Sequence, residues 1–311
     1  MNISRKPKGE NKNDSKKKRT TKHVIGHILI LIKKWQLDSS NGVSRPFVEG
    51  IVFSNEGAKG RTPLFDASNS KTGDIFAYWK DEKSGILEIS APEPGYEIKA
   101  PKSMDCYFYK TIFCNYGAEE KFITYLDVTH LDVSKSTDFS DCFKEFGGNQ
   151  EAEIHGLSAW DVRHGINFSR MFDDAFSENK TVDLDLTSWK FCQDHEIKMN
   201  GMFRRFARKA EEVNLNLGGW NVGKVTGFYE AFKDFACIAE KVNITGVDEW
   251  TVGQGNYISF TSMFENFAPK CNCQLDLSKW SKSGALSGRN YYFALGTFFK
   301  IKEPIWTERV D

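Results

Sequence analysis

Acidic and amide side chains recur at one place in a repeated strand motif, between two apolar residues. The four members are Asp127, Asp185, Asn216 and Asp276. A side chain between two core-facing strand residues points to the opposite face, and neighbouring strands lie about 4.8 Å apart. We therefore expect these groups to form a row on an exposed sheet face, able to bind a basic protein, a glycan or a cation.

Asp132, Asp161 and Asn221 come directly after the Trp position of the repeat and would extend this row. The competing interpretation is structural, because Asp and Asn side chains also bond to turn backbone and keep a sheet soluble. Stacked like charges repel unless a partner or a cation relieves them. Binding and turn formation therefore both stay open for these residues.

The sequence offers little for catalysis. It contains no glycine-rich phosphate loop, no Gly-x-Ser-x-Gly and no His-Glu-x-x-His. The six His lack metal-ligand spacing, and seven irregularly spaced Cys argue against a disulfide framework. Cys271 and Cys273 stand too close together for a zinc knuckle. We expect a protein that is not an enzyme, with no cofactor, no metal and buried or free thiols.

Charge is distributed unevenly, although 42 basic residues balance 42 acidic residues over the 311-residue chain. Residues 1–22 hold nine basic and two acidic residues, a net charge of +7, so the remaining chain carries −7. The most basic run is Lys16, Lys17, Lys18 and Arg19. Such an arm is able to grip nucleic acid or an acidic partner through salt-sensitive contacts.

An apolar stretch, residues 24–32, follows the basic arm. The order resembles a secretory signal, but the stretch contains Gly and His, and no Ala-x-Ala-like cleavage site follows it. The alternatives are a buried strand or short helix behind a basic tail, or an arm for a membrane surface or nucleic acid. No run of about 18 apolar residues exists, so we expect no transmembrane span. We assign residues 1–44 to a basic tail and a short apolar segment, disordered or an atypical signal.

The elements that position the polar row fall into two regions. Short β-prone runs separated by Gly, Pro, Ser and Asn predict a small, mostly antiparallel β region over residues 45–125. From residue 126 the chain repeats. Its markers are spaced by 29 to 31 residues and follow alternating apolar positions typical of strands; they are Trp160, Trp189, Trp220, Trp250 and Trp280.

A second pattern follows each predicted strand. Apolar residues recur at helical spacing, as in Phe168, Met171, Phe172, Ala175 and Phe176. One strand plus one helix every ~30 residues must stack to bury its apolar face. We therefore predict an α/β repeat: a leucine-rich-repeat-like solenoid of about six ~30-residue strand-plus-helix units over 126–299, with a C-terminal tail at 300–311.

These units resemble the repeats of the bacterial surface-protein family related to BspA, which includes mycoplasma lipoproteins with a domain of unknown function. The family unit reads approximately Leu-Asp-x-Ser-Lys-Val-Thr-Asp-Met-Ser-x-Met-Phe, and residues 131–143 match it best. The likeness covers roughly residues 75–299. This chain has longer units, and it shows neither a lipobox Cys nor a wall anchor.

The resemblance implies a leucine-rich-repeat-type fold, display at the cell surface or secretion, and adhesion to a protein or glycan rather than catalysis. Related repeats also occur in protists and in large DNA viruses. The alternative is therefore an intracellular or virion structural protein, whose basic arm contacts nucleic acid or an acidic assembly partner. Oligomeric state and the identity of the ligand do not follow from the sequence.

Overall fold

The structure is a computed structural model. It describes residues 25–37, 46–69, 71, 73–109, 112–113, 121–148, 150–253, 258–272, 274–281, 286–297 and 300–307. The predicted basic arm, including Lys16, Lys17, Lys18 and Arg19, lies outside the described residues. Within the described residues, no helix is long and apolar enough to cross a membrane.

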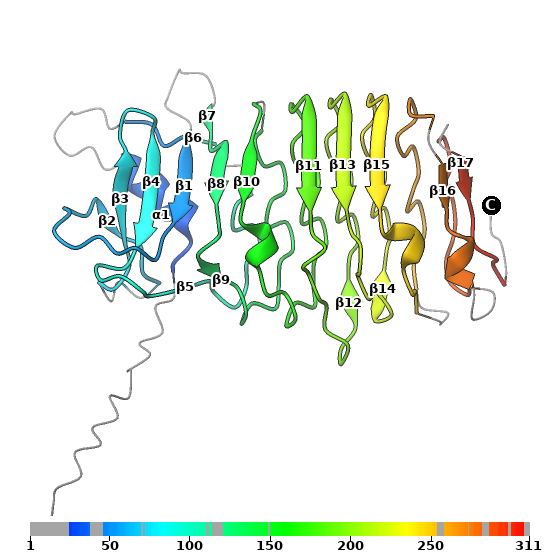
Figure 1. The fold of residues 1–311 in the computed structure, drawn as a ribbon, viewed down its shortest axis with the longest axis horizontal. Helices are drawn as coiled ribbons and strands as arrows, with labels where there is room; N and C mark the ends of the chain where they lie inside the picture. The colour runs from blue at the N-terminus through cyan, green and yellow to red at the C-terminus, as the bar shows by residue number, and fades with distance from the viewer. Residues whose placement is uncertain are drawn as a thin grey trace, which may run out of the picture.

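The N-terminal part of the fold joins a helix to a mixed sheet (Figure 1). Helix α1 (Ile28–Leu37) comes first. The sheet has the order β10-β8-β1-β4-β3-β2. Its strands are β1 (Gly50–Phe53), β2 (Phe65–Asp66), β3 (Phe76–Asp81), β4 (Ile86–Ser90), β8 (Tyr125–Asp127) and β10 (Glu153–His155). Strand β1 pairs in parallel with both β4 and β8, whereas β3 is antiparallel to β2 and β4.

One side of helix α1 packs against the core, while Ile30 on its other side is 61% exposed. Ile25, Ile28 and Ile32 are fully buried. The backbone N–H of Gly26 donates to the carbonyl of Ala67, and the Tyr107 hydroxyl donates to the carbonyl of Gly26. The apolar stretch that resembles a signal therefore covers the N-terminal end of the fold.

Parallel strands dominate the repeated part of the chain. The three-stranded sheet is made of β11 (Thr181–Asp185), β13 (Glu212–Asn216) and β15 (Lys241–Thr245). The other strands form two-stranded sheets: β5 (Ile98–Lys99) with β9 (Leu131–Asp132), β6 (Ile112–Phe113) with β7 (Lys121–Phe122), β12 (Ile197–Lys198) with β14 (Val225–Gly227), and β16 (Gln274–Asp276) with β17 (Lys300–Lys302). Short 3-10 helices are η1 (Leu157–Ala159), η2 (Val247–Glu249) and η3 (Ser278–Ser281).

The prediction of a leucine-rich-repeat-like solenoid built from strand-plus-helix units is wrong. In the described part of the chain, α1 is the only α-helix. The fold consists of several small parallel and mixed sheets. The stretches predicted as helices, such as residues 168–176, are runs of consecutive turns. The region over 45–125 is also mixed rather than mostly antiparallel, because β1 has two parallel neighbours.

The turn runs have a different hydrogen-bond pattern from a helix. Residues four apart take a left-handed conformation, as at Arg170 and Asp174, where φ is 55° and 60°. The N–H of Phe172 donates to the carbonyl of Met202 in the next repeat, 2.8 Å away, instead of bonding four residues back. Each tight turn brings an aromatic residue back to the same face, so the apolar spacing imitates that of a helix. Alternate amides therefore stabilise contacts between repeats, and the amides between them close turns by bonding three residues back.

Aromatic side chains stack through the core from one repeat to the next. The five Trp rings lie nearly parallel, with centroids 5.9 to 6.5 Å apart. The indole Nε1 of Trp189 donates to the carbonyl of Leu157 at 2.8 Å, in the preceding repeat. Phe172 and Phe203 stack at 5.5 Å. The Trp residues are therefore core residues and are not available to stack on a glycan.

Candidate functional site

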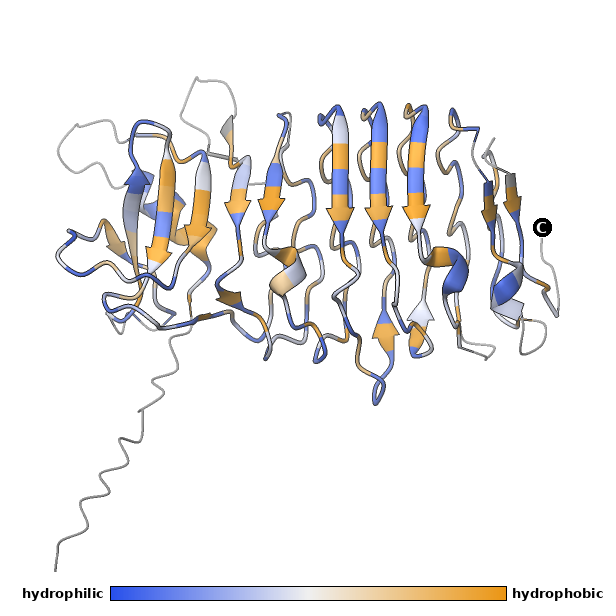
Figure 2. Ribbon diagram, in the orientation of Figure 1, coloured by the Kyte–Doolittle hydropathy of each residue, from blue (hydrophilic) through white to orange (hydrophobic). Residues whose placement is uncertain are grey.

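The outward side chains of five strands form one polar surface, which we call the strand face. Hydrophobic and hydrophilic residues alternate along β11, β13 and β15 (Figure 2), because successive side chains in a strand point to opposite sides. The inward residues, such as Val182 and Leu215, are buried. The outward residues on the strand face are Tyr125, Asp127, Glu153, His155, Thr181, Asp183, Asp185, Glu212, Asn214, Asn216, Lys241, Asn243 and Thr245.

The predicted row is only partly continuous. Asp185 and Asn216 are neighbours in register, and Thr245 follows them on β15. Asp127 is paired with His155, and Asp276 lies on the separate β16–β17 pair. The structure therefore brings two of the four predicted residues together.

Each of these four residues also builds a turn. The Asp185 carboxylate accepts hydrogen bonds from the N–H of Thr187 at 2.9 Å and from its hydroxyl at 2.7 Å. Equivalent bonds run from residues two positions on to Asp127, Asn216 and Asp276. Asp276 also accepts from Lys302, and the Ser278 and Lys302 hydrogen bonds hold its pKa far below the usual range. These side chains end the strands, which is the turn role of Asx residues.

Asp132, Asp161 and Asn221 lie at a different corner of the repeat. They accept backbone hydrogen bonds from Ser134, Arg163 and Gly223, respectively. Hydrogen bonds from the Arg163 guanidinium, 2.7 and 2.8 Å long, lower the pKa of Asp161. The three residues form turns there and do not extend the strand face.

Outward residues that the sequence interpretation missed connect neighbouring strands. Asn214 donates to Asp183 at 2.7 Å, and the Thr245 hydroxyl donates to Asn216 at 2.7 Å. Charge is uneven along the face. Its acidic side chains lie on the strands from β8 to β13, whereas Lys241 lies on β15. The sequence did contain a signal for Asp183. It alternates with the apolar residues Val182 and Leu184, so its side chain points away from the core.

The strand face is interrupted between β10 and β11, which belong to different sheets (Figure 1). A cavity of about 790 Å³ opens there. Its apolar lining includes Ile154, Phe176 and Leu184, and its charged lining includes Glu153 and Asp183. We call this cavity the open junction. Its volume lies in the range of ligand-binding sites.

Asn179 occupies one end of the open junction. Its side-chain oxygen accepts from the N–H of Ala152 at 3.0 Å, and its side-chain nitrogen donates to the carbonyl of Ala152 at 2.9 Å. The amide therefore satisfies backbone groups that a neighbouring strand would otherwise pair. At this junction the Asn179 side chain takes the place of the first backbone hydrogen bonds that would join two paired strands.

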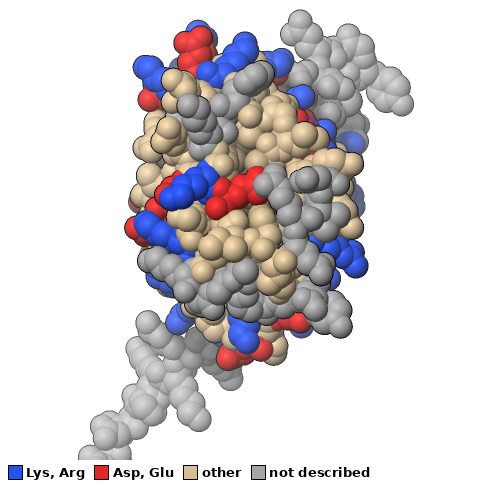
Figure 3. Space-filling view, turned by 90° about the vertical axis from the view of Figure 1, so that its right-hand side faces the viewer, with Lys and Arg blue, Asp and Glu red and all other residues tan. Residues whose placement is uncertain are grey.

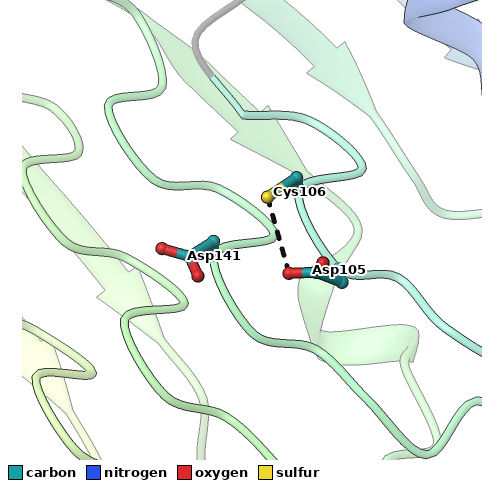
Figure 4. A group of neighbouring side chains, drawn as sticks. All are labelled: Asp105, Cys106 and Asp141. Carbon is teal, nitrogen blue, oxygen red and sulfur yellow. Dashed lines mark hydrogen bonds between the residues drawn. The ribbon is translucent and has the colours of Figure 1, made fainter.

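Two carboxylates and a thiol form a cluster in the turn segments that follow β5 and β9 in the chain: Asp105, Cys106 and Asp141 (Figure 4). The Cys106 thiol donates to Asp105 at 3.4 Å, and burial, together with the charge of Asp105, raises the pKa of Cys106 to about 11. Arg170 holds Asp141 through two hydrogen bonds of 2.6 and 2.8 Å. At neutral pH the thiol is protonated. Cys106 is engaged with Asp105, and Asp141 is ion-paired with Arg170.

The oxidation state of one cysteine differs from the sequence prediction. Cys106, Cys142, Cys192 and Cys237 are free, as expected. Cys271 is disulfide-bonded, so the prediction of buried or free thiols is wrong for this residue.

The C-terminal end of the molecule presents exposed apolar residues. Figure 3 shows this end, where uncharged surface surrounds a few charged side chains. Tyr292 and Leu295 are 54% and 55% exposed. With Phe293 and Trp306 they line a cavity of about 420 Å³. This surface lies apart from the strand face.

Comparison with known proteins identifies one family. The model of the family described as "Mycoplasma protein of unknown function, DUF285" matches residues 112–245 and residues 199–300. Together the matches cover more than half of the 311-residue chain. No curated protein and no solved structure matches it significantly.

Proposed function

Since the chain belongs to the DUF285 family of mycoplasma proteins of unknown function, we propose a function from its surface: it is a non-catalytic adhesion protein. Its ligand is a protein or glycan, which it contacts through the strand face. The observation that supports this proposal is the strand face itself, a polar surface that repeats over five strands, with one interruption, above a buried aromatic core.

The hydrogen bonds across the face favour a role in recognition. Asp183 and Asn214, and likewise Asn216 and Thr245, hold each other in fixed positions. Ordered polar groups lose little conformational freedom when a ligand binds. Acidic side chains toward the N-terminal strands favour basic groups on the ligand, because complementary charge increases both specificity and association rate.

The alternative, an intracellular or virion structural protein, depends on the basic arm. That arm lies outside the described residues, so no structural observation favours this alternative. The strand face supports adhesion directly.

The test is binding of the full chain to arrayed glycans and to a panel of immobilised basic proteins. Asp183→Lys reverses the charge at the centre of the face. Asp194→Lys makes the same change at an exposed position in the bend before β12, which is not part of the strand face. We expect the first variant to weaken binding about tenfold or more and the second to change it less than about twofold, as for rim charges. Equal effects of the two variants, or no ligand on either array, would contradict the proposal.

A further inference from the structure

We propose that the open junction binds an extended peptide segment with basic side chains at alternate positions. The peptide lies between β10 and β11, pairs with β11 and continues the interrupted sheet. This inference deepens the proposed function and rests on it, because it assigns a ligand chemistry to one place on the strand face.

The first argument is the direction of the peptide groups of β11. The carbonyl of Lys180 accepts from the N–H of Glu212, and the N–H of Leu186 donates to Asn216. Peptide groups alternate in direction along a strand in a parallel ladder. Those of Thr181 and Asp183 therefore point away from β13, toward β10.

The facing edge of β10 is open in the same way. The N–H of Glu153 donates to Thr124, and the carbonyl of His155 accepts from Val128, so both residues pair toward β8. The peptide groups of Ile154, between them, point toward β11. Within the described residues, no backbone hydrogen bond joins β10 to β11. Open strand edges of this kind are templates for an added strand.

The second argument concerns the spacing of the chain before β10 and β11, which prevents these two strands from pairing with each other. Gln150 and Asn179 end equivalent turns, since each donates its N–H three residues back to a residue with positive φ. Ile154 follows Gln150 by four residues, whereas Leu184 follows Asn179 by five. A one-residue difference places an inward residue beside an outward residue. Strand β10 matches β8 in register and β11 matches β13, so the mismatch falls between β10 and β11.

The sequence of the turn reinforces the interruption. In the next two repeats the position of Asn179 is occupied by Ala210 and Ala239, which are fully buried. Both alanines precede strands that pair completely, β13 and β15. Of the three repeats that carry β11, β13 and β15, the β11 repeat alone has an amide at this position, and that amide takes the backbone groups of Ala152.

The side chains around the cavity define the peptide. Ile154, Phe176 and Leu184 give it an apolar floor, while Glu151, Glu153 and Asp183 are acidic groups at its exposed rim, with Lys180 and His155 beside them. His155 contacts Glu153 at 3.1 Å. A strand inserted here presents alternate side chains to floor and rim. Apolar residues suit the floor, and Lys or Arg suits the rim.

The probe is a fluorescent peptide of alternating Lys and Val, measured by anisotropy against the full chain. Three further peptides serve as comparisons: one of alternating Glu and Val, the same Lys-Val peptide with methylated backbone amides, and a scrambled Lys-Val peptide. We expect saturable, salt-sensitive binding of the first peptide alone. Absence of binding overturns the proposal, and so does equal binding of the acidic or backbone-methylated peptide.

Two variants close the junction by different routes. Asn179→Ala restores the residue of the regular repeats, and insertion of one Gly after Glu151 restores the regular spacing. We expect each to weaken peptide binding about tenfold or more, because the added strand loses its place. Peptide binding that survives in both variants overturns strand addition.

A matched pair tests the charge of the rim. Glu151→Gln removes one acidic group at the junction, and Glu240→Gln removes the acid at the equivalent turn position before β15. The first should weaken binding about twofold to fivefold, as rim charges do, and the second should leave it unchanged. If the Lys-Val peptide does not bind but Asp183→Lys still weakens binding to the arrays, strand addition alone is rejected. If the peptide does not bind and Asp183→Lys has no effect on array binding, the proposed function is rejected as well.

Discussion

Replacing Asp173 by Asn should weaken the fold more than any surface charge does. The Asp173 side chain is fully buried, with an exposed fraction of 0%. Arg204 donates to it at 2.7 and 3.1 Å, and Arg205 donates at 3.1 and 3.2 Å. One buried carboxylate thus holds two guanidinium groups that come from the next repeat.

The expected loss of unfolding free energy depends on how well each arginine finds water or another partner once the Asp173 carboxylate is removed. Breaking a buried ion pair by removing one partner costs about 3–5 kcal/mol of unfolding free energy. The arginine side chains are 28% and 34% exposed, and Arg204 keeps its contact with Glu230 at 3.0 Å. Partial rehydration of the two arginines lowers the expected loss to about 2–3 kcal/mol.

The assay is urea unfolding followed by tryptophan fluorescence, with far-UV circular dichroism as a second probe. A loss of 2–3 kcal/mol corresponds to a midpoint shift of about 1 M urea. The control is Asp161→Asn, which breaks an ion pair with Arg163 that is 67% exposed on the arginine side and should cost about 0–1 kcal/mol. If the two variants lose the same free energy, inter-repeat ion pairing by Asp173 does not stabilise the fold.

Three further predictions concern the core, a turn and a thiol. Trp220→Phe should cost about 1 kcal/mol more than Trp250→Phe. Trp220 Nε1 donates to Leu186 at 2.8 Å, whereas Trp250 Nε1 has no hydrogen-bond partner among the described residues; equal urea midpoints would contradict this. Gly156→Ala should destabilise by more than about 2 kcal/mol, because φ is +88° and a Cβ would lie 2.3 Å from the Thr129 nitrogen. Gly60→Ala, at φ +81° with open space around it, should cost only about 1 kcal/mol, and thermal melts compare the two. Alkylation of Cys106 should be slow at neutral pH and rise with pH toward about 11, since the thiolate is the nucleophile; peptide mapping that shows full reaction at pH 7 would refute the raised pKa.

The strands and the core could be predicted because their signals are local. Alternation at Leu184 and Leu186 places two side chains in the core, where the structure buries both. The Trp spacing identifies the residue that stacks between repeats. Both signals depend only on which face of the chain each residue occupies.

The helices could not be distinguished from turn runs in the same way. A stripe such as Phe168, Phe172 and Phe176 reports that the chain returns to one face about every four residues, and a series of tight turns does so too. The deciding difference is the hydrogen-bond partner of the backbone amides, because alternate N–H groups bond to the next repeat and those between them bond three residues back. Which groups the amides bond to depends on the stacking of repeats that are far apart in the sequence. The left-handed positions also give no sequence signal, because they are occupied by Arg170 and Asp174 rather than by glycine.

Predicting the candidate site had a similar limit. The sequence predicts both a row at Asp185 and Asn216 and a turn role for the same residues, but the hydrogen bonds that each side chain makes were known only from the structure. The open junction depends on a one-residue difference in one turn, together with an amide at Asn179. Such a difference has no meaning until the neighbouring strands and their registers are known.

The packing of helix α1 sets the order of events for any export of this chain. An export signal must be held by the secretion machinery as a separate apolar segment, yet Ile28 and Ile32 are fully buried in this fold. The adjoining Gly26 hydrogen-bonds to Ala67 and Tyr107, which are synthesised later. Recognition of the segment and folding of the first sheet therefore compete for the same side chains. A protease that cuts after Leu37 would remove helix α1 and expose to water the apolar residues that the helix covers at the N-terminal end of the fold. The uncut chain is thus the form whose first layer is closed.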